Sequence, residues 1–365
     1  MKCHIIARDI QRADAVGNFC RQIAECLRHA SFDVSLLAEN CHPDDRVAVV
    51  GLRGSRPEIP AEDLVFFHYS TEDPWLPLVA GLPNPKIVYF HNITPPAFFA
   101  RYDTSSAAVV RKGLAQRGLA ASFDVLMANS RVSARVLLEG MPSCAYGARD
   151  VLVCPPFVSV DRWHLVLPEA LDLPIAGRLI LYVGRIAPHK GLEDLIDGFA
   201  LVAADEADVG CVIVGGPPDS SYALHINGKI AGLPPSVQER VVMLRDVSDR
   251  KLRYLYERAD ACVSLSEHEG FGVPLVDAMI FDKPLVIRSE PGMLETAGDA
   301  AVVVDAATPQ HVARALMAVL ADSRIRTELA RGRRARLHEL EQAADGRIIL
   351  EASEAALEKY RARAI

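Results

Sequence analysis

Two kinds of hydrophobic pattern alternate along this chain of 365 residues. Short, nearly continuous apolar runs are typical of strands buried on both faces of a parallel sheet, and apolar residues at every third or fourth position are typical of amphipathic helices. In the first part, strands are predicted at residues 3–7, 33–38, 64–68, 86–91, 125–129 and 150–154, and helices at 16–30, 105–121 and 130–139. This alternation predicts a doubly wound α/β domain.

The pattern then stops and starts again. Residues 155–177 contain four prolines and no sustained periodicity, which indicates a linker or a domain boundary. Beyond it, strands are predicted at 179–183, 210–214, 241–244, 261–265, 285–287 and 301–304, and helices at 192–202, 249–258, 274–281, 310–320 and 323–340. We therefore predict an N-terminal domain over 1–160, a linker over 161–177, a second doubly wound domain over 178–344, and a C-terminal helix over 345–365.

Composition and charge narrow the class of protein. Half of the residues are apolar, which excludes a disordered chain, and 40 basic against 47 acidic residues leave a net charge of −7, which disfavours a nucleic acid partner. The eight cysteines form no C-x-x-C pair and are typical of buried thiols in a reducing compartment. Since the first ten residues do not resemble a secretory signal and no apolar stretch reaches 18 residues, we expect a cytoplasmic protein.

Four common site signatures are missing from the sequence. There is no G-x-G-x-x-G fingerprint of a nicotinamide dehydrogenase and no G-x-x-x-x-G-K-[ST] loop of a P-loop nucleotidase. His268-Glu269 lacks the second histidine of a zincin motif, and no D-x-D pair is available for a metal diphosphate. We therefore expect no metal ligands and no tightly bound cofactor.

The first segment with candidate chemistry opens the second domain, at residues 181–191 with the sequence LYVGRIAPHKG. Arg185 and Lys190 lie in a turn between a buried strand and a helix. Two cations beside a helix N-terminus make a suitable cradle for a diphosphate. The alternative is that both are solvated charges of a surface loop.

The second segment is residues 264–279, SLSEHEGFGVPLVDAM. A glycine-rich loop presents Glu269 and is followed by a helix with Pro274 in its first turn and Asp277 about one turn further. Two carboxylates so placed can each hold a vicinal diol of a sugar or a ribose; alternatively, Asp277 only caps or solvates its helix. The backbone N–H groups offered to a ligand are those of Gly270, Phe271, Gly272 and Val273.

Together these segments resemble the retaining glycosyltransferases of family 4, through G-R-x-x-x-x-K-G, E-G-F-G-x-P and the S-D-x-x-L helix start at Ser248. The resemblance implies the GT-B fold, in which two Rossmann-like domains face each other across a cleft. It also implies that Arg185 and Lys190 bind the donor diphosphate, that Glu269 holds hydroxyls of the transferred sugar, and that Asp277 binds the ribose. The family's usual second glutamate is here Asp277, one methylene shorter.

The first domain resembles the family more loosely, at two positions. Gly17 lies in the A-V-G-N helix start where relatives carry a glycine-rich turn near the donor phosphate, and His91 closes a strand where relatives place a histidine near the sugar. The alternatives are an ordinary helix entry and a structural histidine. His68, at the end of the preceding strand, is a weaker candidate.

Residues 101–149 carry seven basic and three acidic residues, a local charge of +4. With Phe98 and Phe99 just before it, this region could touch anionic membrane lipid or a lipid-linked acceptor at the inner face of the membrane. An ordinary solvated helix face is the alternative.

The resemblance implies a retaining, metal-independent hexosyltransferase that moves a sugar from a nucleoside diphosphate to an acceptor hydroxyl in bacterial glycan or polysaccharide biosynthesis. Residues 89–95, YFHNITP, resemble those of bacterial polysaccharide mannosyltransferases, which makes GDP-mannose the first candidate donor and a UDP-sugar the second. Two other functions remain open. They are a nucleotide-sugar epimerase or hydrolase, and a noncatalytic subunit that binds a nucleotide-sugar.

Overall fold

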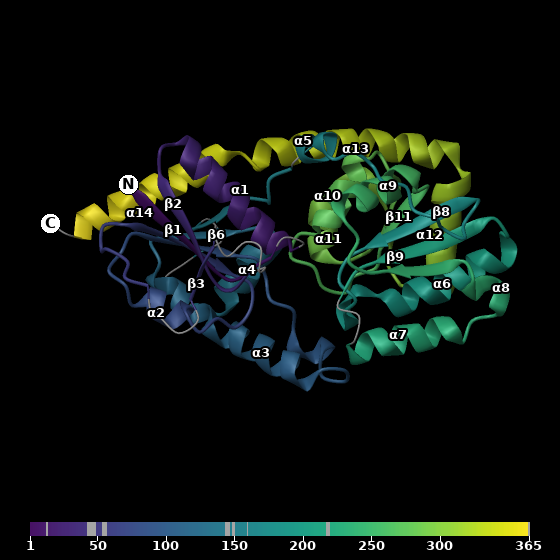
Figure 1. The fold of residues 1–365 in the computed structure, drawn as a ribbon, viewed down its shortest axis with the longest axis horizontal. Helices are drawn as coiled ribbons and strands as arrows, with labels where there is room; N and C mark the ends of the chain where they lie inside the picture. Colours follow the sequence, from purple (N-terminus) through teal and green to yellow (C-terminus); the bar gives the residue numbers. More distant parts are fainter. Residues whose placement is uncertain are drawn as a thin grey trace. The chain divides into compact units, whose positions relative to one another are not determined.

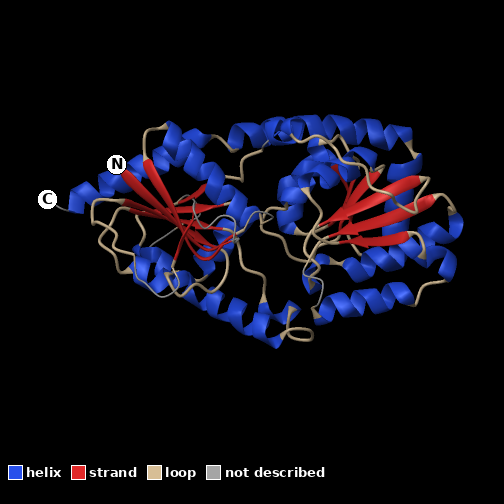
Figure 2. Cartoon of the chain, in the orientation of Figure 1, coloured by secondary structure: helices blue, strands red, loops and turns tan. Residues whose placement is uncertain are grey.

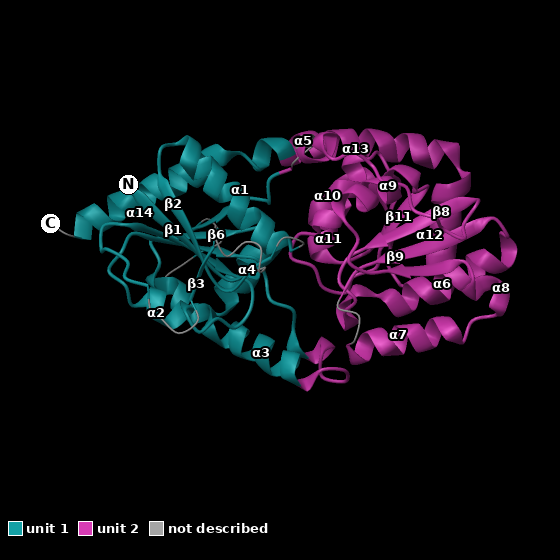
Figure 3. Cartoon of the chain, viewed as in Figure 1, with its two compact units in different colours: residues 1–96, 105–157, 341–365 teal, residues 97–104, 158–340 magenta. Residues whose placement is uncertain are grey.

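The structure is a computed structural model that describes residues 1–11, 14–41, 49–52, 57–142, 147, 150–158, 160–216 and 220–363. The chain divides into two compact units (Figure 3). Unit 1 consists of residues 1–96, 105–157 and 341–365, and unit 2 of residues 97–104 and 158–340. A short segment between two elements of unit 1 therefore belongs, by its contacts, to unit 2.

Unit 1 contains a parallel sheet of seven strands in the order β3-β2-β1-β4-β5-β6-β7. The strands are β1 Lys2–Ile10, β2 Asp33–Cys41, β3 Val49–Gly51, β4 Leu64–Tyr69, β5 Lys86–Phe90, β6 Val125–Ala128 and β7 Val151–Val153. β4 and β5 are buried at every position, as expected for strands covered on both faces. The sequence analysis missed β3, which has only three residues, two of them exposed.

Helices cover both faces of this sheet (Figure 2). They are α1 Ala15–His29, α2 Leu76–Ala80, α3 Thr104–Ala115, α4 Arg131–Glu139 and α14 Gly346–Arg363, with the 3-10 turn η3 Gln116–Ser122. The 3-10 turn η2 Pro96–Phe98 leads from unit 1 into the segment 97–104 of unit 2. The helix predicted over 105–121 thus changes to 3-10 geometry at Gln116. There Gly118 lies so near another turn that a Cβ would stand 3.3 Å from the Gly140 carbonyl.

The C-terminal helix α14 packs on unit 1, beside α1 and over the strands β4, β5 and β6 (Figure 1). Its apolar residues Ile349, Ala352 and Ala356 join the core that contains β1 and α1. At its far end, Lys359 Nζ donates to the Asp124 carbonyl at 2.7 Å, and Arg363 pairs with the Asp124 carboxylate at 2.8 Å. Helix α14 is therefore held by both packing and charge.

Unit 2 contains a second parallel sheet, of six strands in the order β10-β9-β8-β11-β12-β13. The strands are β8 Arg178–Val183, β9 Val209–Val214, β10 Val241–Leu244, β11 Ala261–Ser264, β12 Leu285–Arg288 and β13 Ala301–Val304. Ile180 and Tyr182 of β8 belong to one core cluster, and Leu179 and Leu181 belong to the other. Alternate side chains thus fill cores on opposite faces of the sheet, as the apolar runs predicted.

The helices of unit 2 flank these strands (Figure 2). They are α5 Val160–Leu165, η4 Pro188–Lys190, α6 Leu192–Asp205, α7 Ser221–Ala231, α8 Pro235–Gln238, α9 Asp249–Arg258, α10 Val273–Ile280, α11 Pro291–Ala297, η5 Gly298–Ala300, α12 Pro309–Ala321 and α13 Ser323–Ala343. The sequence analysis did not predict α2, α5, α7, α8 or α11. Four of these have only four to seven residues, too few to show a helical period. Among the described residues, no helix combines the length and apolar character that a membrane span requires.

Candidate functional site

The loop that follows β8 carries the two predicted phosphate-binding cations. The backbone of the exposed Arg185 is held by the hydroxyl of Tyr182, which donates to the Arg185 carbonyl at 2.9 Å. Gly191 has a φ of +66°, and a Cβ there would stand 2.1 Å from the Leu265 carbonyl oxygen. Only glycine combines this backbone conformation with such a close approach. The loop carrying Lys190 is thereby brought against the end of β11.

Lys190 and Glu269, predicted from separate motifs, form an ion pair with Nζ and Oε2 2.6 Å apart. Their side chains are only 12% and 20% exposed. The Glu267 N–H donates to the His189 carbonyl at 2.8 Å, which ties the two loops together. Burial by itself would raise the pKa of Glu269, but Lys190, Arg185 and His268 together hold it below its ordinary value. Glu269 is therefore an ionised carboxylate at neutral pH.

The glycine-rich loop leads into α10 through Gly272, which has a φ of +89°. Gly272 occupies the N-cap position and has no side chain to accept the first helical N–H groups, which helix N-termini offer to anions. The ring of Phe271 is buried in the core, and its carbonyl accepts from the Thr296 hydroxyl. Phe271 thus anchors the loop through its side chain.

Asp277 has a partner that the sequence did not reveal. Its Oδ1 accepts the indole N–H of Trp163 at 2.8 Å. Burial raises the pKa of Asp277 to about 6, against the lowering effects of Trp163 and Arg162. Trp163 lies in the segment without periodicity, so no local signal pointed to this contact.

Glu290 is a second residue that the sequence analysis missed. It is 7% exposed and occupies the N-cap position of α11, where its carboxylate accepts the Met293 N–H at 2.9 Å. Burial raises the pKa of this carboxylate, and the nearby backbone N–H groups of Met293, Glu269 and Gly292 oppose that rise. A glutamate before proline and glycine is no known motif, so sequence alone gave no reason to select it.

In unit 1, Gly17 serves close packing in the first turn of α1. A Cβ at Gly17 would stand 2.3 Å from the Gln11 carbonyl oxygen. The Gly17 N–H donates to the carboxylate of Asp14 at 3.0 Å, so this N–H is already engaged. The predicted contribution to phosphate binding would have to come from other groups of this helix start.

His91 follows β5 and forms a pair with His68, which ends the neighbouring strand β4. The Nε2 of His91 lies 2.8 Å from the Nδ1 of His68. Burial lowers the pKa of His91 to about 3, and burial and the proximity of His91 lower that of His68 well below its ordinary value. The Asn129 side-chain amide donates to the His91 carbonyl at 3.1 Å. The two candidate histidines are therefore a neutral, backbone-anchored pair.

The segment 97–104 packs on unit 2 through aromatic rings. The rings of Phe98 and Phe99 lie 6.1 and 5.7 Å from the ring of His189, and Phe98 lies 6.4 Å from His268. The Tyr102 hydroxyl donates to the Glu193 carboxylate at 3.2 Å. Phe98 and Phe99, which we expected on a basic rim for lipid, are thus engaged next to the loops that carry Lys190 and Glu269.

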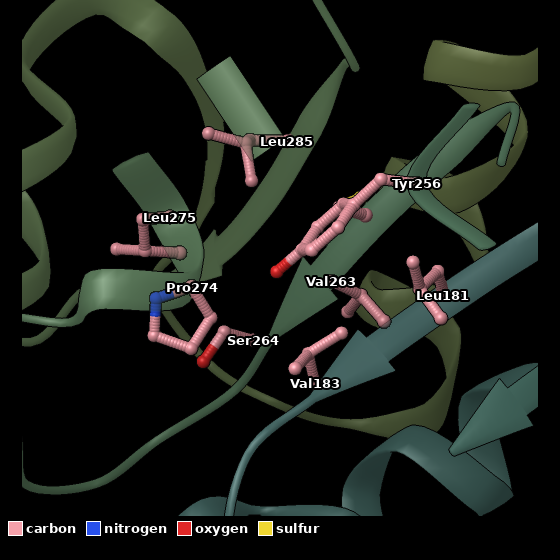
Figure 4. Close-up of a pocket in the computed structure, with 9 residues that line it drawn as sticks. Leu181, Val183, Tyr256, Val263, Ser264, Pro274, Leu275 and Leu285 are labelled. Carbon is pink, nitrogen blue, oxygen red and sulfur yellow. The ribbon is translucent and has the colours of Figure 1, made fainter. Parts of the chain in front are cut away.

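A small cavity lies between β8, β11 and the start of α10 (Figure 4). It is lined by Leu181, Val183, Tyr256, Cys262, Val263, Ser264, Pro274, Leu275 and Leu285. Its volume of about 10 Å³ could hold a single water molecule but no substrate. The Tyr256 hydroxyl is buried and has no hydrogen-bond partner among the described residues. This cavity belongs to the core and not to the candidate site.

Comparisons with known proteins show which families the chain is similar to. Residues 168–336 match the family model described as Glycosyl transferases group 1. The chain is 30% identical over 236 residues to a D-inositol 3-phosphate glycosyltransferase of Xylanimonas cellulosilytica, covering 61% of this chain and 54% of the relative. It is 26% identical over 184 residues to a mannosylfructose-phosphate synthase of Agrobacterium fabrum, covering 47% of this chain and 39% of the relative. The chain spans about half the length of the curated relatives that it matches first.

Two solved structures share the fold along nearly the whole chain. The sucrose-phosphate synthase of Thermosynechococcus elongatus has a TM-score of 0.74 at 18% identity, covering 99% of this chain and 100% of that one. The Anabaena protein HepE, solved in complex with UDP-glucose, has a TM-score of 0.70 at 16% identity, with the same coverage. The predicted fold class, α/β of the GT-B type with two Rossmann-like units, is confirmed.

Proposed function

We propose that the chain is a retaining glycosyltransferase, which the match of residues 168–336 to the family model Glycosyl transferases group 1 supports. It moves a hexose from a nucleoside diphosphate sugar to an acceptor hydroxyl in bacterial glycan or polysaccharide biosynthesis. Unit 2 binds the donor, and unit 1 binds the acceptor.

The observation that carries this proposal is the contact between Lys190 and Glu269, 2.6 Å apart at the ends of β8 and β11. Ligands of doubly wound sheets bind outside the carboxyl ends of the strands. At this edge, a cation suited to a phosphate and an ionised carboxylate suited to sugar hydroxyls lie side by side, next to the glycine-led start of α10. A nucleotide-sugar presents both of these groups to a protein.

In the proposed reaction, the bond between the anomeric carbon and the diphosphate breaks, and negative charge collects on the leaving diphosphate. Arg185 and Lys190 stabilise this charge electrostatically, together with backbone N–H groups at the start of α10. Lys190 exchanges part of its contact with Glu269 for the phosphate, and Glu269 accepts hydrogen bonds from sugar hydroxyls. The departing phosphate oxygen takes the proton of the acceptor hydroxyl that attacks the same face, so the anomeric configuration is kept.

Asp277 binds the ribose diol in this proposal, with a restriction that the structure adds. One carboxylate oxygen accepts from Trp163, so the diol would be held mainly by the other oxygen. The contact with Trp163 fixes the orientation of this shorter carboxylate, which supports a single strong ribose contact in place of a bidentate one.

The donor remains a choice between GDP-mannose and a UDP-sugar. A mannosyl product in the name of one relative supports the first, and the UDP-glucose bound to a structural neighbour supports the second. We propose GDP-mannose as the donor ahead of a UDP-sugar. The reaction needs no tightly bound cofactor, and Arg185 and Lys190 neutralise the charge of the diphosphate without a metal. The acceptor is a glycan or a lipid-linked glycan, and the basic region 101–149 would approach the inner face of the membrane.

The test is a thermal-shift titration of the protein with GDP, UDP, ADP and dTDP in EDTA, followed by turnover of the matching nucleotide-sugars. We expect one base to raise the melting temperature, because a ligand that binds only the native state stabilises it. Lys190→Ala should abolish the shift. The matched control is Lys229→Ala, which removes a comparable ion pair to Asp197, 2.7 Å long, from α7.

Each outcome of this test has a distinct meaning. A shift with turnover that needs an acceptor supports the transferase. Release of free sugar, or of epimerised donor, without an acceptor would show that the protein is a hydrolase or an epimerase and not a transferase. A shift in melting temperature without any turnover would show that it is a noncatalytic binding subunit. No shift with any nucleotide overturns the proposal.

A further inference from the structure

Arg288 ends strand β12, at the same end of the sheet as Lys190 and Glu269. Parallel strands have their carboxyl ends on one side, and ligands of such sheets bind there. β12 pairs in parallel with β11, and the loop that follows β11 carries Glu269. The side chain of Arg288 is only 20% exposed. A charged group that is largely removed from water needs partners, and Arg288 has them on two segments of the chain.

The guanidinium of Arg288 joins the loop after β11 to the first turn of α6. On the loop, Nη1 donates to the Leu265 carbonyl at 3.3 Å and lies 3.4 Å from a carboxylate oxygen of Glu267. On the helix, Nη2 donates to the Asp194 carboxylate at 2.9 Å. The three partners therefore belong to the two segments that flank the candidate site in unit 2.

The same two segments also touch on either side of Lys190. The Glu267 N–H donates to the His189 carbonyl at 2.8 Å. A Cβ on Gly191 would stand 2.1 Å from the Leu265 carbonyl oxygen, so the two backbones are in close contact there. Both loop residues that meet the neighbours of Lys190 are thus held by the guanidinium as well.

Charge gives the guanidinium a second effect on this junction. Burial and neighbouring carboxylates, Glu267 among them, raise the pKa of Asp194, and Arg288 opposes that rise. Like charges on two facing segments repel each other unless a cation compensates them. A guanidinium suits this position, because its rigid fork can serve one carboxylate with one Nη group and a second carboxylate and a carbonyl with the other. Its removal should therefore loosen the contact between the two segments.

We propose that Arg288 is a positioning residue, which holds the loops of Lys190 and Glu269 at the spacing that a nucleotide-sugar needs to bind both side chains at once. This inference rests on the proposed function for the roles of Lys190 and Glu269. A nucleoside diphosphate lacks the sugar that Glu269 would hold. The start of α10 is anchored separately through Phe271, so the nucleoside diphosphate depends less on the spacing of the loops.

The experiment compares Arg288→Met with the matched control Arg178→Met. Arg178 begins β8, at the opposite end of the strands of the same sheet, and also pairs with two carboxylates, Glu206 at 2.7 Å and Asp208 at 3.0 Å. Affinities for GDP, GDP-mannose, UDP and UDP-glucose are measured by calorimetry. For Arg288→Met we expect the affinity for the nucleotide-sugar to fall about tenfold, and that for its nucleoside diphosphate by less than about threefold. Arg178→Met should leave both affinities unchanged.

A second measurement needs no ligand. Hydrogen exchange of the Glu267 amide reports the contact between the two loops, because this N–H bonds to the His189 carbonyl and a guanidinium has no acceptor to offer it. Exchange should accelerate about tenfold in Arg288→Met and stay unchanged in Arg178→Met. Arg288→Lys keeps a cation between the carboxylates and loses the fork, so it should fall between Arg288→Met and the unmodified protein in both measurements.

Equal losses of affinity for the nucleotide-sugar and its nucleoside diphosphate, or unchanged exchange of the Glu267 amide in Arg288→Met, would overturn the positioning role. If Arg288→Met does not fold, Arg288→Lys takes its place, with Arg178→Lys as its control. If the unmodified protein binds no nucleotide-sugar, the proposed function fails. Exchange of the Glu267 amide would then still decide whether Arg288 holds the two loops together.

Discussion

Asp277 provides a test of the electrostatics of this site, because its buried negative charge lowers the free energy of unfolding. Burial raises its pKa from an ordinary 3.8 to about 6. The folded protein therefore binds this proton more tightly than the unfolded chain does. Hence stability falls as the pH rises from about 4 to 6, and the full cost is present at pH 7 and above.

The magnitude follows from the two pKa values. A rise from 3.8 to about 6 corresponds to about 3 kcal/mol at pH 8 and to about half of that at pH 5. Asp277→Asn removes the charge and keeps a side-chain oxygen that can accept the Trp163 N–H. We therefore expect the variant to be more stable than the unmodified protein, by an amount that doubles between pH 5 and pH 8.

The assay is urea unfolding of both proteins between pH 5 and pH 8, followed by fluorescence and circular dichroism. The donor titration is repeated on the variant, which should lose nucleotide affinity if Asp277 also binds the ribose. A stability difference that does not change with pH, or a variant that is less stable at pH 8, would refute the argument from burial.

Three further outcomes are expected. Trp163→Phe removes a bond that lowers the pKa of Asp277 in the folded protein, so stability should go on falling to a higher pH in the same urea titrations, while the pH at which the fall begins stays unchanged. Gly191→Ala should lower the free energy of unfolding by about 3 kcal/mol or more, because it combines a positive φ with a clash. In the control Gly216→Ala, where a Cβ meets nothing within 4 Å, the free energy of unfolding should change by less than about 1 kcal/mol. Asp124→Ala should speed hydrogen exchange in the last turn of α14, since Arg363 loses the carboxylate with which it pairs while Lys359 keeps the backbone carbonyl of residue 124, and unchanged exchange would contradict that anchor.

Much of the fold was predictable because its determinants are local. A strand such as β9, Val209–Val214, is buried at all six positions and appears in the sequence as an unbroken apolar run. The start of α9 at Asp249, capped by Ser248, is equally local. Short elements such as β3 and α11 were not predicted. β3 has three residues, two of them exposed, and the seven residues of α11 make fewer than two helical turns.

The same distinction between local and long-range determinants applies to the residues of the candidate site. Arg185, Lys190 and Glu269 could be selected from the sequence because residue types and spacing within one strand-loop-helix turn suggest phosphate and sugar chemistry. Trp163 could not, because its contact with Asp277 joins residues that are 114 positions apart and leaves no periodic trace.

The sequence by itself therefore determined the two parallel sheets and the loops that carry ionisable groups, since burial and backbone preference act on neighbouring residues. Only the tertiary structure decided which groups meet. It placed Lys190 on Glu269, engaged Asp277 with Trp163, and assigned residues 97–104 to unit 2. These outcomes depend on packing between distant segments, where a hydrogen bond or a missing Cβ fixes an arrangement that no local pattern encodes.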